Sequence, residues 1–595
     1  MKETTTCGLD CYDACSITVD SQGKLSGDAS HPVGNGALCV HLHTHLNQSP
    51  RIDVPLVDGK EVSMQEALDA VASALDGKKS LLWRGSGNVG VMQEVTNLLM
   101  EKVGGSLTKG SLCDGAGDAG ILLGRGVNKV LPLEQIAKAD TVVVWGRNVT
   151  VTNAHLMPYL EGKELLVIDP VQTPIAKKAS LHLQIAPRTD YYVAILLARF
   201  IFMEDSEDTQ WLEEFAPEFE DFYDYTREHR IKAILSYVGL SLGDMGDAIE
   251  YLRNKKVVFL VGAGVQKYSV GASTLHAIDS LAATLGLFGQ EGCGVSYLSN
   301  SKLGFENPFA VDVPCVSKVN TPFASFESVI VQGGNPAASM PSSSTVCEAL
   351  ESVENLIYFG LYENETSQKA RIVIPAKNFL EKEDIRLSYG HHYVQTMAKV
   401  KESHIGMSEY EFTQALFERL GFEGLQSEAS YLKTWLNQCQ KEEAHYISPA
   451  YEATPYANGF GKEGGDDFEF IEEYEDDFVN TKRFRRYRKE RTEKESIPYF
   501  WLLSPKSVKS LNTQFQRGKC VELPSTLGYI QGEHVRLVSD YGTLILKVKI
   551  NDDIRDDCVV VRSSVSGVNQ LTPNIVSEEG ENACYQEVKV RLERV

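Results

Sequence analysis

Residues 141–148 read Thr-Val-Val-Val-Trp-Gly-Arg-Asn, a continuous apolar run that ends in a turn. Similar short runs recur at residues 80–83, 164–168, 256–261, 328–331, 355–359 and 371–374, and stretches with helical periodicity separate them. Apolar, β-branched runs that alternate with helices are typical of parallel sheets covered on both faces. The sequence therefore predicts an α/β fold of interleaved, doubly wound parallel-sheet domains. In such folds, ligands bind at the carboxyl ends of the strands.

The two ends of the chain differ from this body. Cys7, Cys11, Cys15 and Cys39 lie close together near the N-terminus, which predicts a small iron-sulfur domain. Residues 534–550 alternate between apolar and polar side chains, as strands of a β-hairpin do. We therefore expect four parts: a 4Fe-4S domain over 1–55, a catalytic body over 56–440, a charged linker over 441–496 and a C-terminal β-barrel domain over 497–595.

The four cysteines have the chemistry of a metal-cluster site. Three thiolates at intervals of four residues, closed by a fourth from a later loop, surround one compact site, and 4Fe-4S clusters use this ligation. Structural zinc sites usually take two close cysteine pairs instead. We predict a 4Fe-4S cluster held by Cys7, Cys11, Cys15 and Cys39, with zinc or a set of buried structural thiols as the alternatives.

Composition and charge limit the partners and the location. The chain has 595 residues, 43% of them hydrophobic, and a formal net charge of −23. Nucleic-acid binding needs clustered Lys and Arg, so no nucleic acid is expected as a partner. Only six residues precede Cys7, too few for a leader peptide, and the most apolar run, residues 191–203, is too short to cross a bilayer. We expect a cytoplasmic protein without direct membrane insertion.

Two glycine-rich loops are candidate ligand sites. Gly85-Ser-Gly87-Asn-Val-Gly follows a predicted strand and opens a helix, as a dinucleotide-binding loop does, but the acidic residue that NAD sites place further on is absent. The second loop, Gly110 to Gly120, contains Cys113. A thiolate among glycines is open to close approach by a large ligand and binds soft metals. An ordinary tight turn for the first loop and an inert thiol for the second are the alternatives.

Taken in order along the chain, these motifs resemble those of the molybdopterin oxidoreductases of the dimethyl sulfoxide reductase superfamily. The resemblance implies a molybdenum or tungsten ion chelated by two pterin guanine dinucleotides, with a nearby 4Fe-4S cluster that passes electrons. The segments that match are the cysteine set with 50–56, Gly85-Ser-Gly87, 110–117, 140–148, 168–170, 187–190, 262–266, 289–294, 334–336 and 374–376.

The resemblance also implies roles for single residues. Cys113 takes the place of the protein ligand to molybdenum or tungsten, and Asp114 beside it is the candidate proton donor or acceptor. Asp169 and Asp190 offer carboxylate acceptors for guanine or ribose donors. The full set expected to contact the pterin dinucleotides is Gly85, Gly87, Gly146, Arg147, Asn148, Asp169, Arg188, Asp190, Gly264, Gly334, Asn335 and Asn569. For each of these, a turn residue without a cofactor contact is the alternative.

Two departures from the family pattern bear on function. Many members have Lys or Arg two residues after the fourth cysteine, where this chain has His41, the residue expected on the electron route from cluster to pterin. Formate dehydrogenases follow the metal ligand with His and carry an Arg where Ser299 stands, whereas Asp114 follows Cys113 here. Formate oxidation is therefore a minority hypothesis.

The predicted function is that of an oxidoreductase that passes electrons between a 4Fe-4S cluster and a bis-pterin metal centre. Its substrate would be a small inorganic or organic molecule such as an S-oxide or another sulfur compound. An electron-transfer protein or an iron-sulfur subunit is the expected partner. A non-catalytic electron-relay or structural subunit of a larger redox complex is the alternative.

Overall fold

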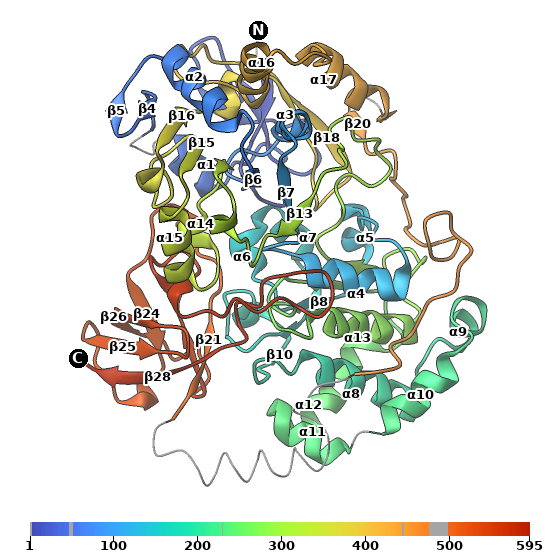
Figure 1. Ribbon diagram of the computed structural model, residues 1–595. Helices are drawn as coiled ribbons and strands as arrows, with labels where there is room; N and C mark the ends of the chain where they lie inside the picture. The colour runs from blue at the N-terminus through green and yellow to red at the C-terminus, as the bar shows by residue number, and fades with distance from the viewer. Residues whose placement is uncertain (1–2, 47–50, 229, 443–444, 475–497) are drawn as a thin grey trace.

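The body of the protein is built on two parallel sheets (Figure 1). The structure is a computed structural model that describes residues 3–46, 51–228, 230–442, 445–474 and 498–595. In the smaller sheet the strand order is β10-β9-β8-β11-β12, and every neighbouring pair is parallel. Its strands are β8 (Thr141–Trp145), β9 (Glu164–Ile168), β10 (Leu181–Leu183), β11 (Val257–Val261) and β12 (Gly294–Ser296).

The larger sheet has the order β13-β7-β6-β14-β15-β16-β4-β5, parallel from β13 to β16 with an antiparallel edge. Its strands β4 to β7 precede the smaller sheet in the chain, and β13 to β16 follow it. The two domains are therefore interleaved, which confirms the predicted fold class. The strands are β4 (Leu56–Val57), β5 (Lys60–Glu61), β6 (Ser80–Arg84), β7 (Ser106–Lys109), β13 (Cys315–Ser317), β14 (Ser328–Gln332), β15 (Asn355–Gly360) and β16 (Ile372–Pro375).

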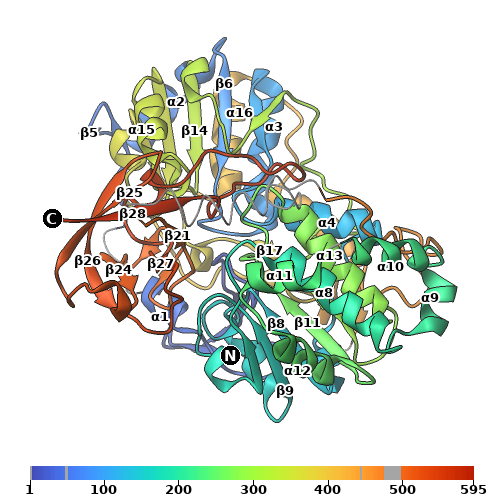
Figure 2. The ribbon, with the colours of Figure 1, turned by 90° about the horizontal axis from the view of Figure 1, so that it is seen from below.

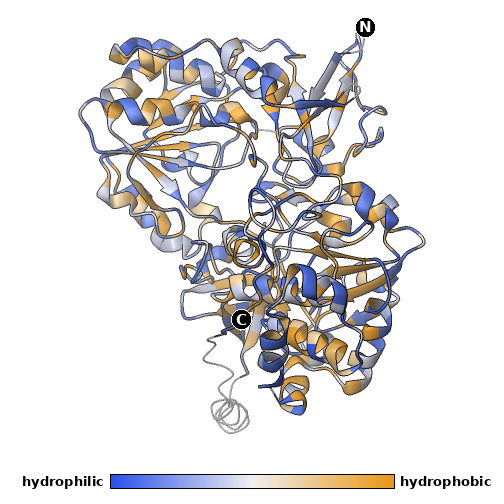
Figure 3. Cartoon of the chain, turned by 90° about the vertical axis from the view of Figure 1, so that its right-hand side faces the viewer, coloured by the Kyte–Doolittle hydropathy of each residue, from blue (hydrophilic) through white to orange (hydrophobic). Residues whose placement is uncertain are grey.

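Helices cover both faces of each sheet, and the hydropathy colouring shows apolar strands between them (Figure 3). Val143 and Trp145 of β8 point into the core beneath α8 and α13, whereas Val142 and Val144 point to the opposite core. This alternation is why these strands are apolar throughout. The helices of the body are α2 (Met64–Leu75), α3 (Thr96–Val103), α4 (Gly115–Arg125), α5 (Leu133–Lys138), α6 (Val149–Thr152), α7 (Met157–Leu160), α8 (Asp190–Met203), α9 (Thr209–Phe215), α10 (Phe219–Arg227), α11 (Ile231–Val238), α12 (Leu242–Leu252), α13 (Gly271–Thr284), α14 (Pro336–Ser339), α15 (Ser343–Glu351), α16 (Glu409–Leu420) and α17 (Glu428–Asn437).

The N-terminal cysteines lie in loops next to a small antiparallel sheet and one helix: three between the first two strands, and Cys39 just before the helix. These elements are β1 (Glu3–Thr6), β2 (Ser16–Val19), β3 (Leu25–Gly27) and α1 (Val40–Leu46). A second antiparallel sheet, of β17 (Asp384–Arg386), β18 (Tyr393–Met397), β19 (Gln440–Glu442) and β20 (His445–Ile447), packs beside it through β1 and β18. In the part of the chain that the structure describes, no helix is both long and apolar enough to cross a membrane.

The C-terminal residues form a closed six-stranded barrel that lies beside both parallel-sheet bodies (Figure 2). Its strands, in barrel order, are β21 (Phe500–Leu503), β27 (Cys558–Val560), β24 (Cys520–Leu523), β26 (Thr543–Ile550), β25 (His534–Val538) and β28 (Lys589–Arg594). A two-stranded ribbon, β22 (Ser510–Leu511) and β23 (Gln514–Phe515), extends from it toward the cysteines.

Part of the segment predicted to be a solvated linker is packed into the fold. Within residues 445–474, Phe468, Phe470 and Ile471 are buried in the same core as α8 and α13. Their aromatic and aliphatic side chains explain this packing, because burial of each stabilises the fold by roughly 1.5–3 kcal/mol. Most of the predicted charged blocks lie in residues 475–497, which are outside the described residues.

Candidate active site

The first two loops of the site come from neighbouring strands of the smaller sheet. Gly146 follows β8 with a left-handed φ of +57°, and Gly262 and Gly264 follow β11. A Cβ atom on Gly264 would lie 2.9 Å from the carbonyl oxygen of Gly146, and one on Gly262 would collide with it. The two loops therefore need glycine in order to pack against each other at the carboxyl ends of their strands.

The larger sheet repeats this arrangement. Gly85 and Gly87 follow β6, and Gly333 and Gly334 follow the adjacent strand β14. Cβ atoms on Gly85 and Gly87 would lie 2.5 and 2.7 Å from the carbonyl oxygen of Gly333. Loop-to-loop packing thus accounts for these glycines, and their contact with a pterin stays a prediction.

Cys113 lies where loops of both sheets and the barrel meet. It stands just before α4, and the Ser111 hydroxyl accepts from the backbone N–H of Cys113 at 2.9 Å and of Asp114 at 3.0 Å. From the loop after β11, Lys267 donates to the carbonyl of Cys113 at 2.5 Å, and Gln266 donates to the same oxygen. The backbone of Ser111 also pairs with residues 581–583 of the barrel domain. Three parts of the protein therefore fix the position of this cysteine.

Cys113 is exposed to solvent, and nearby protein atoms still desolvate its thiol. Desolvation by the surrounding protein and the nearby Asp114 carboxylate raise the pKa of Cys113 to about 11, although Lys267 lies close by. A thiol with a raised pKa is protonated near neutral pH, and a coordinated metal ion is what deprotonates it. The donor therefore fits a metal ligand better than a free nucleophile.

Three buried donors near Cys113 have no hydrogen-bond partner within the described residues. They are the Tyr12 and Tyr297 hydroxyls and Nη1 of Arg147, whose guanidinium lies 4.2 Å above the Tyr12 ring centre. Burial raises the pKa of Tyr12 to about 12, and the charges of Asp114 and Cys113 add to this increase. Buried donors are normally satisfied, so these three fit a ligand with acceptor atoms, as a pterin or an oxygen-bearing substrate has.

Asp169 and Asp190 form a pair of buried carboxyl groups. Asp169 follows β9 and accepts from the backbone N–H of Val171 at 2.8 Å, and Asp190 opens α8 and accepts from the Trp145 indole at 2.8 Å. Burial raises their pKa values to about 7 and about 6, and the charge of Asp190 contributes to the shift of Asp169. Two desolvated acceptors at strand and helix ends fit the N–H groups of a guanine.

The side chains of the remaining predicted cofactor residues already have protein partners. Arg188, with a left-handed φ of +69°, pairs with Glu587 of the barrel domain at 2.7 Å. Asn335 donates to Glu365 at 2.8 Å, Asn569 donates to the carbonyl of Ala338 at 2.7 Å, and Asn148 accepts from Thr150 at 2.6 Å. These contacts join the domains or fix turns, and direct cofactor contacts stay predictions for all four.

The four N-terminal cysteines lie close enough together for their charges to raise one another's pKa. Cys15 contacts both Cys39 and His155, with its sulfur 3.2 Å from Nε2 of His155. The backbones of Leu9, Ala14 and Leu42 act to lower the pKa of Cys7, Cys11 and Cys39 respectively. Burial raises the pKa of Cys7 and Cys11, so these thiols need a cationic centre to ionise.

Within the described ranges, no three His, Cys, Asp or Glu side chains are placed to hold one metal ion. The thiol chemistry of the four cysteines fits a 4Fe-4S cluster. The cluster and the zinc alternative both stay predictions.

His41 lies between the cysteines and the barrel ribbon. Its side chain acts to lower the pKa of Cys39, its ring stacks on Phe515 of β23 with ring centres 6.4 Å apart, and its buried Nε2 has no partner among the described residues. The position agrees with a place on the electron route, which remains a prediction.

Sequence reasoning missed several residues of the site. Gln266 and Lys267 directly follow the Gly262–Gly264 loop, and Tyr12 lies inside the cysteine motif, so proximity to these motifs was an available signal. Tyr297 and Arg386 lie near neither motif in the sequence, so no signal of this kind was available for them. Arg386 donates to the carbonyl of Cys11 from a position 375 residues further along the chain.

The interleaved sheets, the barrel and the exposed Cys113 at their junction are the features of a molybdopterin-binding type of enzyme. Residues 51–409, more than half of the chain, match the family model described as "Molybdopterin oxidoreductase", and the chain belongs to this family. Its enzyme class is that of an oxidoreductase, and the family implies a molybdenum or tungsten pterin cofactor.

Individual relatives differ in their described activities. "Probable oxidoreductase YyaE" of Bacillus subtilis (strain 168) is 28% identical over 488 residues, which is 73% of this chain and 72% of the relative. The "Assimilatory nitrate reductase catalytic subunit" of the same strain is 22% identical over 59% of this chain and 58% of its own length. The solved structure of acetylene hydratase from Pelobacter acetylenicus superposes with a TM-score of 0.75 over 100% of both chains, at 14% identity. This last likeness shows the fold.

Proposed function

We propose that the protein is a molybdenum- or tungsten-dependent oxidoreductase in which a 4Fe-4S cluster on Cys7, Cys11, Cys15 and Cys39 exchanges electrons with a bis-pterin metal centre ligated by Cys113. The observation that carries this proposal is the position of Tyr12. It directly follows Cys11, and it lies close enough to Cys113 for the charges of Cys113 and Asp114 to raise its pKa. The two candidate redox sites are therefore neighbours.

The protein's own residues supply position, hydrogen bonds and proton handling. When bound, the pterin-chelated metal supplies the redox or oxo-transfer chemistry. Gln266 and Lys267 hold the Cys113 backbone in place. The Asp114 carboxylate accepts from the Ser111 hydroxyl at 3.0 Å, which holds it next to Cys113, where it would give or take the substrate's proton.

The unpartnered donors favour an oxygen-bearing substrate. Tyr12, Tyr297 and Arg147 offer hydrogen bonds that a sulfoxide or similar small oxide would accept. Formate oxidation is less favoured, because Ser299, where formate dehydrogenases of this family carry Arg, is 6% exposed and donates to the carbonyl of Tyr389 at 3.0 Å. We infer a small S-oxide or related sulfur compound as substrate, with an electron-transfer protein or iron-sulfur subunit as partner.

Metal analysis of the anaerobically purified chain is the first test. About four iron atoms and one molybdenum or tungsten per chain are expected. Iron without the heavier metal would indicate the alternative, a non-catalytic electron-relay subunit, and zinc in place of iron would contradict both. Reduction of S-oxides, N-oxides and nitrate by a reduced viologen dye, beside formate oxidation, then identifies the substrate class.

Substitution of Cys113 tests the metal ligand. Cys113→Ala is expected to leave the iron content and the cluster spectrum unchanged, to alter the electron paramagnetic resonance signal of the molybdenum or tungsten, and to lower turnover at least about 100-fold, because even changes around metal ligands cost about 10- to 100-fold. Cys315→Ala, another exposed cysteine, is the matched control. An unchanged signal in Cys113→Ala would refute ligation.

A further inference from the structure

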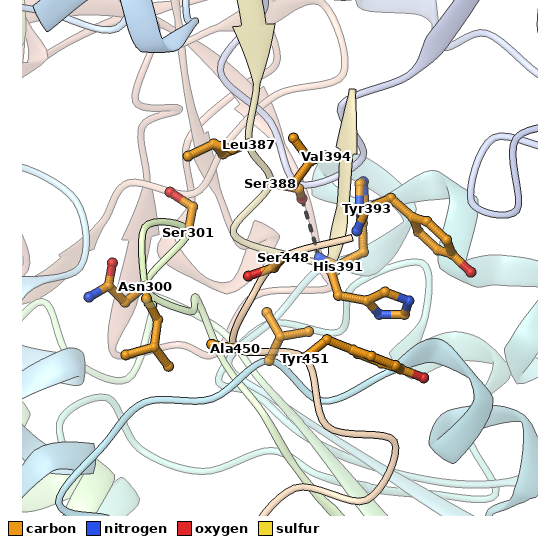
Figure 4. Close-up of a pocket in the computed structure, with 13 residues that line it drawn as sticks. Asn300, Ser301, Leu387, Ser388, His391, Tyr393, Val394, Ser448, Ala450 and Tyr451 are labelled. Carbon is orange, nitrogen blue, oxygen red and sulfur yellow. Dashed lines mark hydrogen bonds between the residues drawn. The ribbon is translucent and has the colours of Figure 1, made fainter. Parts of the chain in front are cut away.

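The loop that carries Cys11 and Cys15 is fixed by hydrogen bonds from side chains of residues 386–395, the segment from β17 to β18. Four side chains of this segment donate hydrogen bonds to five backbone carbonyl oxygens of residues 9–14. Figure 4 shows two of the four, Ser388 and His391, in the wall of the pocket behind the loop. The pairs are Arg386 with Leu9 (3.3 Å) and Cys11 (3.1 Å), Ser388 with Tyr12 (2.8 Å), His391 with Asp13 (3.1 Å) and Gln395 with Ala14 (2.5 Å).

These bonds orient the peptide groups of the loop. A trans peptide points its N–H away from its C=O. In the Asp13–Ala14 peptide, the carbonyl accepts from His391, and the Ala14 backbone acts to lower the pKa of Cys11. In the Gly8–Leu9 peptide, the carbonyl accepts from the backbone of Val89 at 2.7 Å, and the Leu9 backbone acts to lower the pKa of Cys7. The hydrogen bonds thus fix the carbonyl dipoles of this loop, and the N–H groups of the same peptides point the opposite way.

Arg386 adds a full positive charge to this arrangement. Its side chain is 3% exposed, and its guanidinium donates to the carbonyls of Leu9, Cys11 and Leu387. Across the described chain, no carboxylate lies within ion-pair distance of it. An unpaired buried charge is costly to a fold. A negative group nearby would offset this cost. The guanidinium lies against the loop that carries Cys7 and Cys11, and its charge acts to lower the pKa of both thiols.

We propose that Arg386 is the buried cation that sets the reduction potential of the cluster held by the four cysteines. The four thiolates give a 4Fe-4S cluster a net negative charge, and reduction by one electron makes it more negative. A fixed cation in a region of low dielectric stabilises the reduced form more than the oxidised form, which raises the reduction potential. Arg386 is a positioning residue, since it acts on the cluster through space and through the carbonyls that it holds.

The proposal rests on the 4Fe-4S site of the proposed function, and the experiment separates the two. The wild-type chain, purified whole and without oxygen, is first assayed for iron and sulfide and for the cluster's electron paramagnetic resonance signal. A chain without iron would overturn the cluster, and with it this inference. Where the cluster is present, a redox titration of that signal gives its reduction potential, a readout that does not depend on turnover.

Arg386→Gln removes the charge and keeps an N–H donor on the side chain. The expected result is unchanged iron content with a reduction potential shifted to more negative values. Arg371→Gln is the matched control, because it changes the net charge equally at a residue that is 42% exposed and paired with Asp58. Solvent and salt screen that position, so no shift is expected there. A potential in Arg386→Gln equal to that of the wild type would overturn the proposal.

Arg386→Lys covers the case in which the Gln variant fails to assemble its cluster. Lysine keeps the charge but not the planar fork that reaches three carbonyls. If charge is the decisive property, Arg386→Lys retains iron and has a potential closer to that of the wild type than to that of the Gln variant. A Lys variant that also lacks the cluster would show that the hydrogen bonds, rather than the charge, are what the site requires, and would overturn the tuning role.

Discussion

Asp169 gives a quantitative test of the idea that a residue placed to bind a ligand lowers the folding stability of the chain without that ligand. Its side chain is 9% exposed at the end of β9 and lies near a second buried carboxyl group, Asp190. Burial raises the pKa of Asp169 from 3.8 to about 7. Asp169→Asn removes the ionisation and keeps an oxygen that can accept from the backbone N–H of Val171.

The sign of the effect follows from the direction of the pKa shift. The folded chain holds this proton at pH values where the unfolded chain has lost it, so the stability contribution is present below about pH 4 and is lost as the pH rises to about 7. Each pKa unit corresponds to about 1.4 kcal/mol. Integrated between pH 5 and pH 8, the wild type therefore loses about 2.5 kcal/mol that the Asn variant keeps.

Thermal unfolding of chain produced without pterin cofactor is the assay. The advantage of Asp169→Asn in Tm is expected to grow between pH 5 and pH 8, by about 5–10 °C for a domain-sized unfolding unit. Asp58→Asn, at a carboxylate that is 62% exposed, should follow the wild type at both pH values. A difference between Asp169→Asn and the wild type that stays constant across this range would refute the reasoning. In protein produced with cofactor, Asp169→Asn should retain less pterin dinucleotide.

Two further predictions concern α4, the helix that follows Cys113. Arg125 and Asp279 form an ion pair with side chains that are 1% and 0% exposed. Arg125→Met should therefore lower the free energy of unfolding, measured by urea titration, by about 3–5 kcal/mol, and the double variant Arg125→Met, Asp279→Leu should regain most of it. A double variant as unstable as the single variant would contradict this. A Cβ atom at Gly117 would collide with the Tyr297 ring. Gly117→Ala should therefore lower the free energy of unfolding by about 1–3 kcal/mol and reduce the metal content of the chain. Adding Tyr297→Ala should restore stability. If the double variant is no more stable than Gly117→Ala, the Tyr297 ring is not the cause.

The fold class could be predicted because local patterns specify it. Runs such as 142–145 are apolar at every position, as expected for a sheet covered on both faces, and the structure buries all four of these residues. In the described end of the predicted linker, apolar side chains are buried rather than solvated. Phe468 and Phe470 pack into the core beneath α13, because their apolar area outweighs the charge of the surrounding sequence.

The candidate site was predictable where a residue's chemistry identifies it. Residue type and place after a strand made several groups stand out. They are the thiols of the N-terminal quartet and of Cys113, and the carboxyl groups of Asp169 and Asp190. The hydroxyl of Tyr297 and the segment 386–395 could not be found in this way, since tyrosine, serine and arginine occur on every surface and their partners lie far along the chain.

The sequence by itself determined the strands, the glycine loops after them and the set of sulfur and oxygen donors, because hydrophobic period, backbone freedom and side-chain chemistry are local properties. The tertiary structure alone decided that Tyr12 of the cysteine motif would lie near Cys113, and that Arg386 would be buried against a loop 375 residues away. Those contacts depend on how the interleaved sheets pack. Burial in that packing also sets the pKa shifts and the electrostatic field at the site, which no local pattern encodes.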